Sequence, residues 1–374
     1  MIIGFDGQNA VYNNKRRVDF SRMVLDKLSL HQPDNSYIIY TPDVIDNAYL
    51  ASLITRSNVK LKHRHHRLSA FMWRSVNGVL HNMRRHRVQV YHGLCGQVPL
   101  KINSSGVPSV VTFKSTAFLS KNYKMGGFKR MLKKYMAKKS CKNAQCITTL
   151  TQSMKQCLVD NLNIDGDRII VVPPAISDQY CRLSEGMLNE AMHHYGITRD
   201  QFVLVSCSTM ADDYLTIMKA IAHCEGKPLE MLLMGRCSKF VAHELKKHKE
   251  ECNFKGNIYN ISRSHHSRLA AITSLARACV ITGDNHKFPN VASGAQFLGI
   301  PVITSNQFAD VVGDGAMVLD LCNEQQLTEA LSLVNSNEAA RNAIIERGKE
   351  NAKQFDGEIM AQRYVDIYKS LLNK

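Results

Sequence analysis

The sequence predicts an α/β fold built from two doubly wound halves. Short apolar runs with strand-like composition alternate with amphipathic stretches of helical periodicity, and this alternation occurs twice along the 374 residues. A polar segment, 173–186, separates the two series. Alternation of this kind is typical of parallel sheets covered by helices, and a chain of this length has room for two cores.

The elements follow one another in a regular order in each half. In the first half we expect strands at 1–5, 36–40, 88–91, 109–113, 146–149 and 169–172, with helical stretches that include 20–29 and 71–83. In the second half we expect strands at 202–206, 229–234, 257–261, 279–282 and 301–304, with helices at 214–223, 267–276, 291–298, 324–335, 338–354 and 357–372. The domains are therefore predicted at 1–176 and 177–356. Sheets of this type bind ligands at the carboxyl ends of their strands, which predicts a cleft between the two halves.

The charge of the chain is concentrated in one region. The formal net charge is +16, yet residues 47–159 contain 21 Lys and Arg and no Asp or Glu, so the remainder is net acidic. A field this one-sided indicates an anionic partner, such as lipid headgroups or a phosphorylated acceptor, and a solvated basic face is the alternative. Aromatic residues make up 7% and do not alternate with the basic ones, which argues against specific nucleic-acid binding.

Within this basic region, residues 128–139 have the pattern of a basic amphipathic helix. Its large apolar side chains fall at helical spacing and lysines fill most other positions: Phe128, Met131, Leu132, Tyr135 and Met136. We expect the apolar stripe to face the domain core, with the flanking lysines reaching outward. The alternative is a helix that lies on an anionic membrane.

The cysteines do not indicate a disulfide framework or a metal centre. There are 11 of them, an odd number, and none forms a C-x-x-C pair. Reduced thiols in the cytoplasm are the expected state. The run His63-Arg64-His65-His66 has no carboxylate neighbour, so we interpret it as part of the basic face and predict no metal site. The opening residues do not form a signal peptide, and no apolar run is long enough to span a bilayer.

Several segments, in order, resemble the family 4 retaining glycosyltransferases with the GT-B fold, above all the bacterial members that build surface polysaccharides. The segments that carry the likeness are Tyr91-His92-Gly93-Leu94, Met231-Leu232-Leu233-Met234-Gly235, Phe288-Pro289-Asn290-Val291, Gly299-Ile300-Pro301-Val302-Ile303 and Asp310-Val311-Val312-Gly313-Asp314. The resemblance implies two facing Rossmann-like domains, the first for the acceptor and the second for the donor nucleotide. It also implies that helix 357–374 crosses back to the first domain.

The resemblance assigns a donor site to the second domain. The implied donor-binding residues are Gly235, Arg236, Asp284, His286, Lys287, Asn290 and Val291. Gly235 allows a nucleotide to come close to the backbone, and the helix that begins near Asn290 provides amide groups for phosphate. His92 and Lys114 are candidates for the cleft of the first domain. For His92 the alternative is a histidine packed at a strand end, and for Lys114 it is an ordinary loop lysine.

Several residues that normally handle the donor are replaced. The family's Arg and Lys fall on Ala211 and Asp212, and its two glutamates fall on His286 and Gly294. The glycine-rich loop of the first domain corresponds to residues 14–19, which contain no glycine, and the family's His-Asp corresponds to Lys114-Ser115. Arg236, Lys287 and Lys114 could supply cations from new positions.

Two functions therefore stay open. The first is a retaining hexosyltransferase that moves a sugar from a nucleotide sugar to an anionic lipid-linked or saccharide acceptor in surface-polysaccharide synthesis, without a metal or other cofactor. The second is a catalytically impaired relative that acts as a binding subunit, with a partner glycosyltransferase. Either would be cytoplasmic, with peripheral association with the inner face of the membrane through the basic first domain.

Overall fold

The computed structural model describes residues 1–7, 10–11, 20–41, 48–63, 78–121, 123, 125–206, 211–235, 239–261, 268–283 and 286–373. The chain divides into two compact units. The first consists of Met1–Ala175, His286–Phe288 and Phe355–Lys374, and the second of Ile176–Asn285 and Pro289–Gln354. The short segment His286–Phe288 therefore belongs with the first unit, although the sequence places it in the second domain.

The first unit is built on a seven-stranded parallel sheet with the order β3-β2-β1-β4-β5-β6-β7. Its strands are β1 (Ile2–Asp6), β2 (Ser36–Thr41), β3 (Val59–His63), β4 (Val90–Gly93), β5 (Ser109–Phe113), β6 (Cys146–Thr149) and β7 (Ile169–Val171). Its helices are α2 (Phe20–His31), α3 (Ala48–Ile54), α5 (Gly78–Arg85), α6 (Gly127–Asn143), α7 (Gln152–Leu162) and α17 (Gly357–Leu372). The order reverses beside β1, which is the topological switch point of a doubly wound sheet.

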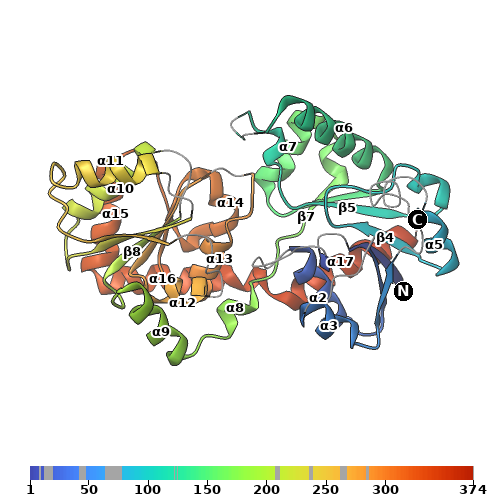
Figure 1. Ribbon diagram of the computed structural model, residues 1–374, viewed down its shortest axis with the longest axis horizontal. Helices are drawn as coiled ribbons and strands as arrows, with labels where there is room; N and C mark the ends of the chain where they lie inside the picture. The colour runs from blue at the N-terminus through green and yellow to red at the C-terminus, as the bar shows by residue number, and fades with distance from the viewer. Residues whose placement is uncertain are drawn as a thin grey trace. The chain divides into compact units, whose positions relative to one another are not determined.

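The two faces of this sheet are covered by different helices (Figure 1). On one face, Tyr91, Val111 and Ile147 pack with residues of α5, α6 and α7. On the other face lie α2 and α17, which pack against each other. The C-terminal helix thus belongs to the first unit, where Tyr364 and Tyr368 bury their rings completely.

The second unit repeats this plan with a six-stranded parallel sheet of order β10-β9-β8-β11-β12-β13. Its strands are β8 (Phe202–Ser206), β9 (Glu230–Met234), β10 (Ile258–Ile261), β11 (Ala278–Ile281), β12 (Val302–Thr304) and β13 (Met317–Val318). Its helices are α8 (Asp178–Cys181), α9 (Glu185–Tyr195), α10 (Ala211–His223), α11 (Lys239–His248), α12 (Leu269–Leu275), α13 (Asn290–Phe297), α14 (Ala309–Val312), α15 (Glu324–Ser336) and α16 (Glu338–Ala352).

The pleat of β8 shows how both faces of the second sheet are buried. Val203 and Val205 point to the side covered by α10, α11 and α15, whereas Phe202 and Leu204 point to the side of α9, α12 and α13. The continuous apolar run therefore serves two cores, as buried parallel strands require. Side-chain caps begin several helices, for example Asn323 Oδ1, which accepts the Gln326 N–H at 3.1 Å at the start of α15.

Helix α6 turns a different face to the core than the sequence predicts. Its buried residues are Met136, Ala137, Ser140 and Cys141. The stripe expected to face the core is instead exposed: Phe128 by 73%, Met131 by 63%, Leu132 by 46% and Tyr135 by 55%. The core interpretation of this stripe is wrong, with the exception of Met136. The small residues in the second half of α6 let this part of the helix pack closely, which leaves the bulky first half outside.

Candidate functional site

The carboxyl ends of β8, β11 and β12 form a connected edge in the second unit. Thr282 follows β11, and its hydroxyl donates to the backbone oxygen of Ser206, at the end of β8, at 2.6 Å. The hydroxyl of Thr304, at the end of β12, donates to the backbone oxygen of Ile281 at 3.0 Å. Strand order reverses between β8 and β11, so this edge is the switch point where doubly wound sheets bind ligands.

Two glycines follow strands at this edge with a backbone that other residues rarely adopt. Gly235 follows β9 with φ 129°, and Gly283 comes after β11 with φ 131°. Gly235 stays tied to the sheet, because its N–H donates to the backbone oxygen of Ile261 at 3.1 Å. A Cβ added at Gly283 would meet nothing within 4 Å. The backbone at both strand ends is therefore shaped by glycine, and at Gly283 it borders open space.

Helix α13 follows the same edge and begins at the predicted donor residues. Pro289 precedes the helix, Asn290 is exposed and Val291 is half-buried. A helix start concentrates N–H groups and partial positive charge, which favours an anion. The predicted residues Asn290 and Val291 thus lie in the first turn of a helix of the second unit.

One turn further along α13, Gly294 is packed against an aromatic ring. A Cβ at this position would lie 2.3 to 2.7 Å from atoms of the Tyr180 ring. Tyr180 comes from the short helix α8 and is 5% exposed. In this packing, no side chain larger than hydrogen fits at the position where the resemblance implies a glutamate.

His286 is held by residues of the first unit, with which it is grouped. Its backbone oxygen accepts the Thr116 N–H at 3.0 Å, and its Nδ1 lies 3.0 Å from the Thr116 hydroxyl oxygen. The Cys157 sulfur is 3.8 Å from the same nitrogen. Burial raises the pKa of the Cys157 thiol, with Thr116 and Asn161 acting in the opposite direction by hydrogen bonding. Cys157 therefore stays a neutral thiol beside the ring.

Lys287 continues this contact. It forms an antiparallel bridge with Ser115 in the segment that follows β5, and its Nζ lies 5.6 Å from the centre of the Tyr123 ring. Lys114, half-buried, directly precedes Ser115. The structure thus brings the predicted residues His286 and Lys287 next to the predicted residue Lys114.

His92 lies inside the first unit. Its side chain is 0% exposed, its Nδ1 is 2.7 Å from the Tyr368 hydroxyl, and its Nε2 is 2.6 Å from the Thr112 hydroxyl. Burial lowers the pKa of His92 to about 3, so the ring is neutral at physiological pH. Because both ring nitrogens are bonded and no surface is exposed, this position agrees with the packed-histidine interpretation and not with a cleft residue.

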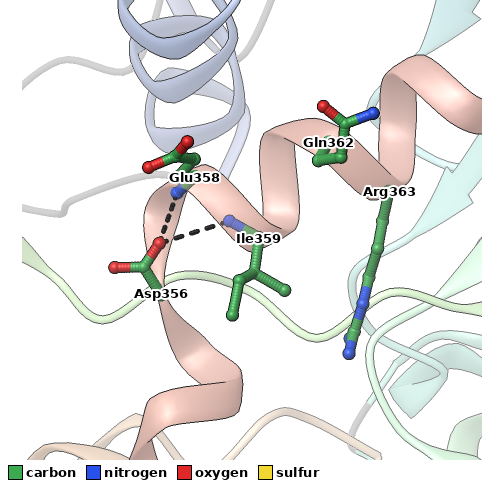
Figure 2. Close-up of a pocket in the computed structure, with 5 residues that line it drawn as sticks. All are labelled: Asp356, Glu358, Ile359, Gln362 and Arg363. Atoms are coloured by element: carbon green, nitrogen blue, oxygen red, sulfur yellow. Dashed lines mark hydrogen bonds between the residues drawn. The ribbon is translucent and has the colours of Figure 1, made fainter.

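A hollow of about 330 Å³ borders α17 and is lined by Asp356, Glu358, Ile359, Gln362 and Arg363 (Figure 2). Asp356 caps the helix there: its Oδ1 accepts the N–H groups of Glu358 at 2.7 Å and Ile359 at 3.2 Å. None of the predicted site residues lines this hollow. The carboxylate of Asp356 is used for capping, so the hollow does not mark the donor site.

Of the predicted site residues, Arg236 and Asp284 lie outside the described residues, as do residues 14–19 of the expected loop. Sequence reasoning missed Thr116 and Cys157 as partners of His286, and Tyr180 as the neighbour of Gly294. No local pattern marks these contacts, since Thr116 and His286 are 170 positions apart. Gly283 had a usable signal, because it closely follows a predicted strand.

Among the described side chains, no three of the types His, Cys, Asp and Glu come together as a metal site would require. The same part of the chain contains no helix of the length and apolar character needed to cross a membrane. The nine described cysteines form no disulfide with one another; Cys141, Cys252 and Cys279 are buried thiols.

Comparison with known proteins assigns each half of the chain. Residues 29–180 match the model of Glycosyltransferase Family 4, and residues 197–351 match the model of Glycosyl transferases group 1. No curated protein matches the sequence significantly.

Solved structures resemble the chain over nearly its full length. A glycosyltransferase from Rickettsia africae ESF-5 has a TM-score of 0.70 at 13% identity, with 99% of this chain and 98% of that chain covered. HepE from Anabaena, solved with UDP and glucose, has a TM-score of 0.70 at 12% identity, with 99% and 100% covered. WaaG, a glycosyltransferase involved in lipopolysaccharide biosynthesis, has a TM-score of 0.61 at 14% identity, with 98% and 99% covered.

At these identities the solved structures establish the fold, and each family model assigns the part of the chain that it matches. The two parallel α/β units match the order of the two models, one model to each half. The chain therefore combines a region that matches Glycosyltransferase Family 4 with a region that matches Glycosyl transferases group 1, and it has the GT-B fold.

Proposed function

We propose that this protein transfers a sugar from a nucleotide sugar to a lipid-linked or saccharide acceptor, with retention of the anomeric configuration. The proposal rests on one observation. In the region that matches the group 1 model, Gly235 and Gly283 follow two strands of the sheet, and helix α13 begins at the same edge. HepE, a protein of the same fold, was solved with UDP and glucose. The second unit is accordingly the donor domain.

The reaction requires stabilisation of a diphosphate that gains negative charge as the glycosidic bond breaks. Groups that interact more strongly with this charge in the transition state than in the ground state accelerate the reaction. In our proposal the first-turn amides of α13, at Asn290 and Val291, contact the phosphates. Gly235 leaves the backbone at the end of β9 open to the nucleotide, because it has no side chain.

The cations come from positions that differ from those implied by the resemblance. Ala211 and Asp212 begin α10 and have no positive group. We assign the compensating charge to Arg236, Lys287 and Lys114. A flexible or forked cation next to a diphosphate provides charge-assisted hydrogen bonds, which are about twice as strong as neutral ones. Asp284 and His286 are proposed to contact the donor sugar.

We propose that the acceptor is anionic, and that it is either lipid-linked or a saccharide. The support is the basic stretch 47–159, which lies entirely in the first unit, and the fold similarity to WaaG, which is involved in lipopolysaccharide biosynthesis. An acceptor with phosphate groups would be attracted by this field.

Isothermal titration with UDP, GDP and their common sugars tests the donor site. We expect one of the nucleotides to bind, and Arg236→Gln and Lys287→Gln each to weaken its binding by about tenfold, because each removes one charge-assisted contact worth roughly 1.4 kcal/mol. Lys246→Gln is the matched control, since Lys246 is an exposed lysine on α11. If no nucleotide or nucleotide sugar binds, the donor-site proposal fails.

A second function is supported by the packing of Gly294. The Tyr180 ring leaves no space there for a carboxylate side chain, and His286 stands at the position of the other implied glutamate. We infer as the alternative that the protein is an impaired relative that acts as a binding subunit for a partner glycosyltransferase.

A single measurement distinguishes the two functions. Release of nucleoside diphosphate from a nucleotide sugar, in the presence of lipid extract, is followed for the purified chain alone. Steady release would exclude the binding-subunit alternative. Absence of release, together with co-purification of an active transferase, would favour it over transfer by this chain.

A further inference from the structure

Helix α6 carries a large apolar group of side chains that the first unit does not cover. Phe128, Met131, Leu132 and Tyr135 are exposed and recur at intervals of three and four residues, so they form one stripe along the first half of the helix. Single exposed apolar residues are common on proteins, but a contiguous group of four large ones marks an interaction site.

This stripe lies opposite the surface with which α6 packs. Met136, Ala137, Ser140 and Cys141 are buried, and Ala137 and Cys141 belong to the core that packs on the sheet. With 3.6 residues per turn, Phe128 and Ala137 differ by two and a half turns and point in opposite directions. The stripe is therefore directed outward from the unit and is not an incomplete part of its core.

Basic residues continue the same outward face. Lys138, Lys139 and Lys142 extend the stripe toward the C-terminal end of α6, and all three are exposed. Lys133 and Lys134 are exposed as well, on other sides of the helix. Within the described residues no ion pair involves a lysine of α6. We call the set Phe128, Met131, Leu132, Tyr135, Lys138, Lys139 and Lys142 the outer face of α6.

We propose that the outer face of α6 lies on an anionic lipid bilayer, with its apolar half inserted among the headgroups and its lysines on the lipid phosphates. A bilayer surface offers this sequence of environments, with hydrocarbon a few ångströms below a negatively charged layer. Phe128 and Tyr135 are of the type that inserts at this boundary, and lysine stems reach back to the phosphates. The contact would leave the remaining surface of the unit available to a lipid-linked acceptor.

Other occupants fit the outer face less well. A second copy of the chain would bring the same lysines together, and like charges repel. Nucleic acid would match the lysines, but Met131 and Leu132 offer neither base stacking nor hydrogen bonding to it. Only a partner that is both negatively charged and apolar matches both halves of the face.

Sedimentation with vesicles of phosphatidylcholine, with or without phosphatidylglycerol, tests the proposal on the full chain without any sugar. Wild-type protein is expected to bind the anionic vesicles and to bind the neutral ones weakly. The variant Lys138→Gln/Lys139→Gln/Lys142→Gln should lose about a hundredfold in affinity for anionic vesicles, since each lysine near such a surface contributes roughly fivefold. The control Lys246→Gln/Lys247→Gln/Lys255→Gln removes the same charge from exposed positions of the second unit and should bind almost as wild type.

The apolar half is tested by Phe128→Ser/Met131→Ser/Leu132→Ser. We expect at least about tenfold weaker binding to anionic vesicles, because apolar insertion is lost while all charges stay. The control Leu30→Ser/Ile54→Ser/Leu333→Ser changes exposed apolar residues elsewhere and should bind as wild type. Because all these side chains are exposed, unfolding temperatures should change little, and thermal denaturation checks this.

A fluorescent reporter distinguishes insertion from attraction by charge alone. Phe128→Trp should shift its emission to the blue and be quenched by brominated lipids in anionic vesicles, whereas Leu333→Trp should not. An apolar variant that binds as wild type, an unquenched Phe128→Trp, a dimer that the apolar variant abolishes, or RNA that displaces the vesicles at physiological salt would each overturn the proposal. Donor binding in solution does not enter any of these measurements, so failure here leaves the proposed sugar transfer untouched.

Discussion

His92 belongs to a recognisable sequence motif, and its side chain is buried in the interior of the first unit. The imidazole lies between Phe5 and Tyr364, with ring centres 5.6 and 5.1 Å away, and both nitrogens bond to hydroxyl groups. A neutral imidazole provides one donor and one acceptor, which the hydroxyls of Tyr368 and Thr112 can complement. A protonated ring would place a charge in a site with no solvent, which is why burial lowers its pKa.

The depressed pKa predicts a specific loss of stability in acid. Unfolded His92 has a pKa near 6.5 and folded His92 one of about 3, so protons bind the unfolded state first. Above pH 6.5, protonation of His92 does not change the free energy of unfolding. As pH falls from 6.5 toward 3, the free energy of unfolding decreases by up to about 1.4 kcal/mol per pH unit, because the unfolded state binds the proton.

We expect His92→Gln to be less stable than wild type near neutral pH and to show a shallower loss of stability on acidification. Urea denaturation at about pH 7, 6 and 5 measures both quantities. The control His193→Gln changes an exposed histidine of α9 and should keep the wild-type slope. If the free energy of unfolding depends on pH in the same way for wild type and His92→Gln, this histidine is not the group that causes the loss of stability in acid.

At the scale of elements, the contact between α8 and α13 determines which side chains fit beside the candidate phosphate-binding turn at the start of α13. Gly294 lies one turn from Asn290, and the Tyr180 ring occupies the space next to it. The short helix α8 lies within the polar segment 173–186, which the sequence marks only as a linker. The linker region therefore contributes a buried aromatic residue to the second core.

This contact predicts that Gly294→Ala destabilises the protein by about 2 kcal/mol, because the added methyl group meets the Tyr180 ring at less than van der Waals distance. Gly186→Ala, in helix α9 with open surroundings, should instead stabilise it by roughly 0.5 kcal/mol. Chemical denaturation of Gly294→Ala, Tyr180→Ala and the double variant forms a cycle. Additive effects would mean that the two residues do not press on each other.

At the scale of the whole molecule, the order of the chain differs from the order of its compact units. Helix α17 is the last element in sequence, yet it belongs to the first unit, where it packs on α2 and buries Tyr364 and Tyr368. Residues 1–175 alone therefore have a sheet with one face incompletely covered, whereas 176–354 contains nearly all of its own core.

Fragments of the chain should consequently behave differently. Residues 176–354 are expected to unfold cooperatively when expressed alone, while residues 1–175 should remain poorly packed until a peptide of residues 355–374 is added. Circular dichroism melts and amide exchange with and without the peptide measure this. Cooperative unfolding of 1–175 by itself, unchanged by the peptide, would contradict the role given to α17.

Much of the fold was predictable because its signals are local. The apolar run at 202–206 and the segment ending in Gly235 identify strands and a strand end without any knowledge of their neighbours. Strand β3 (Val59–His63) was missed, because it lies at the edge of its sheet and carries two lysines, so it lacks the continuous apolar character of the central strands. Edge strands tolerate such residues since one side is not paired.

The sequence by itself determined most of the strands and helices, the two-unit plan and the resemblance to glycosyltransferases, since each depends on periodicity and on short motifs. Tertiary structure alone decided that His92 is buried, that Gly294 adjoins Tyr180, that His286 bonds to Thr116 and that α6 turns its apolar stripe outward. The physical reason is the same in each case. A helical or strand pattern states which residues share a face, but only packing with elements distant in the chain determines where that face points.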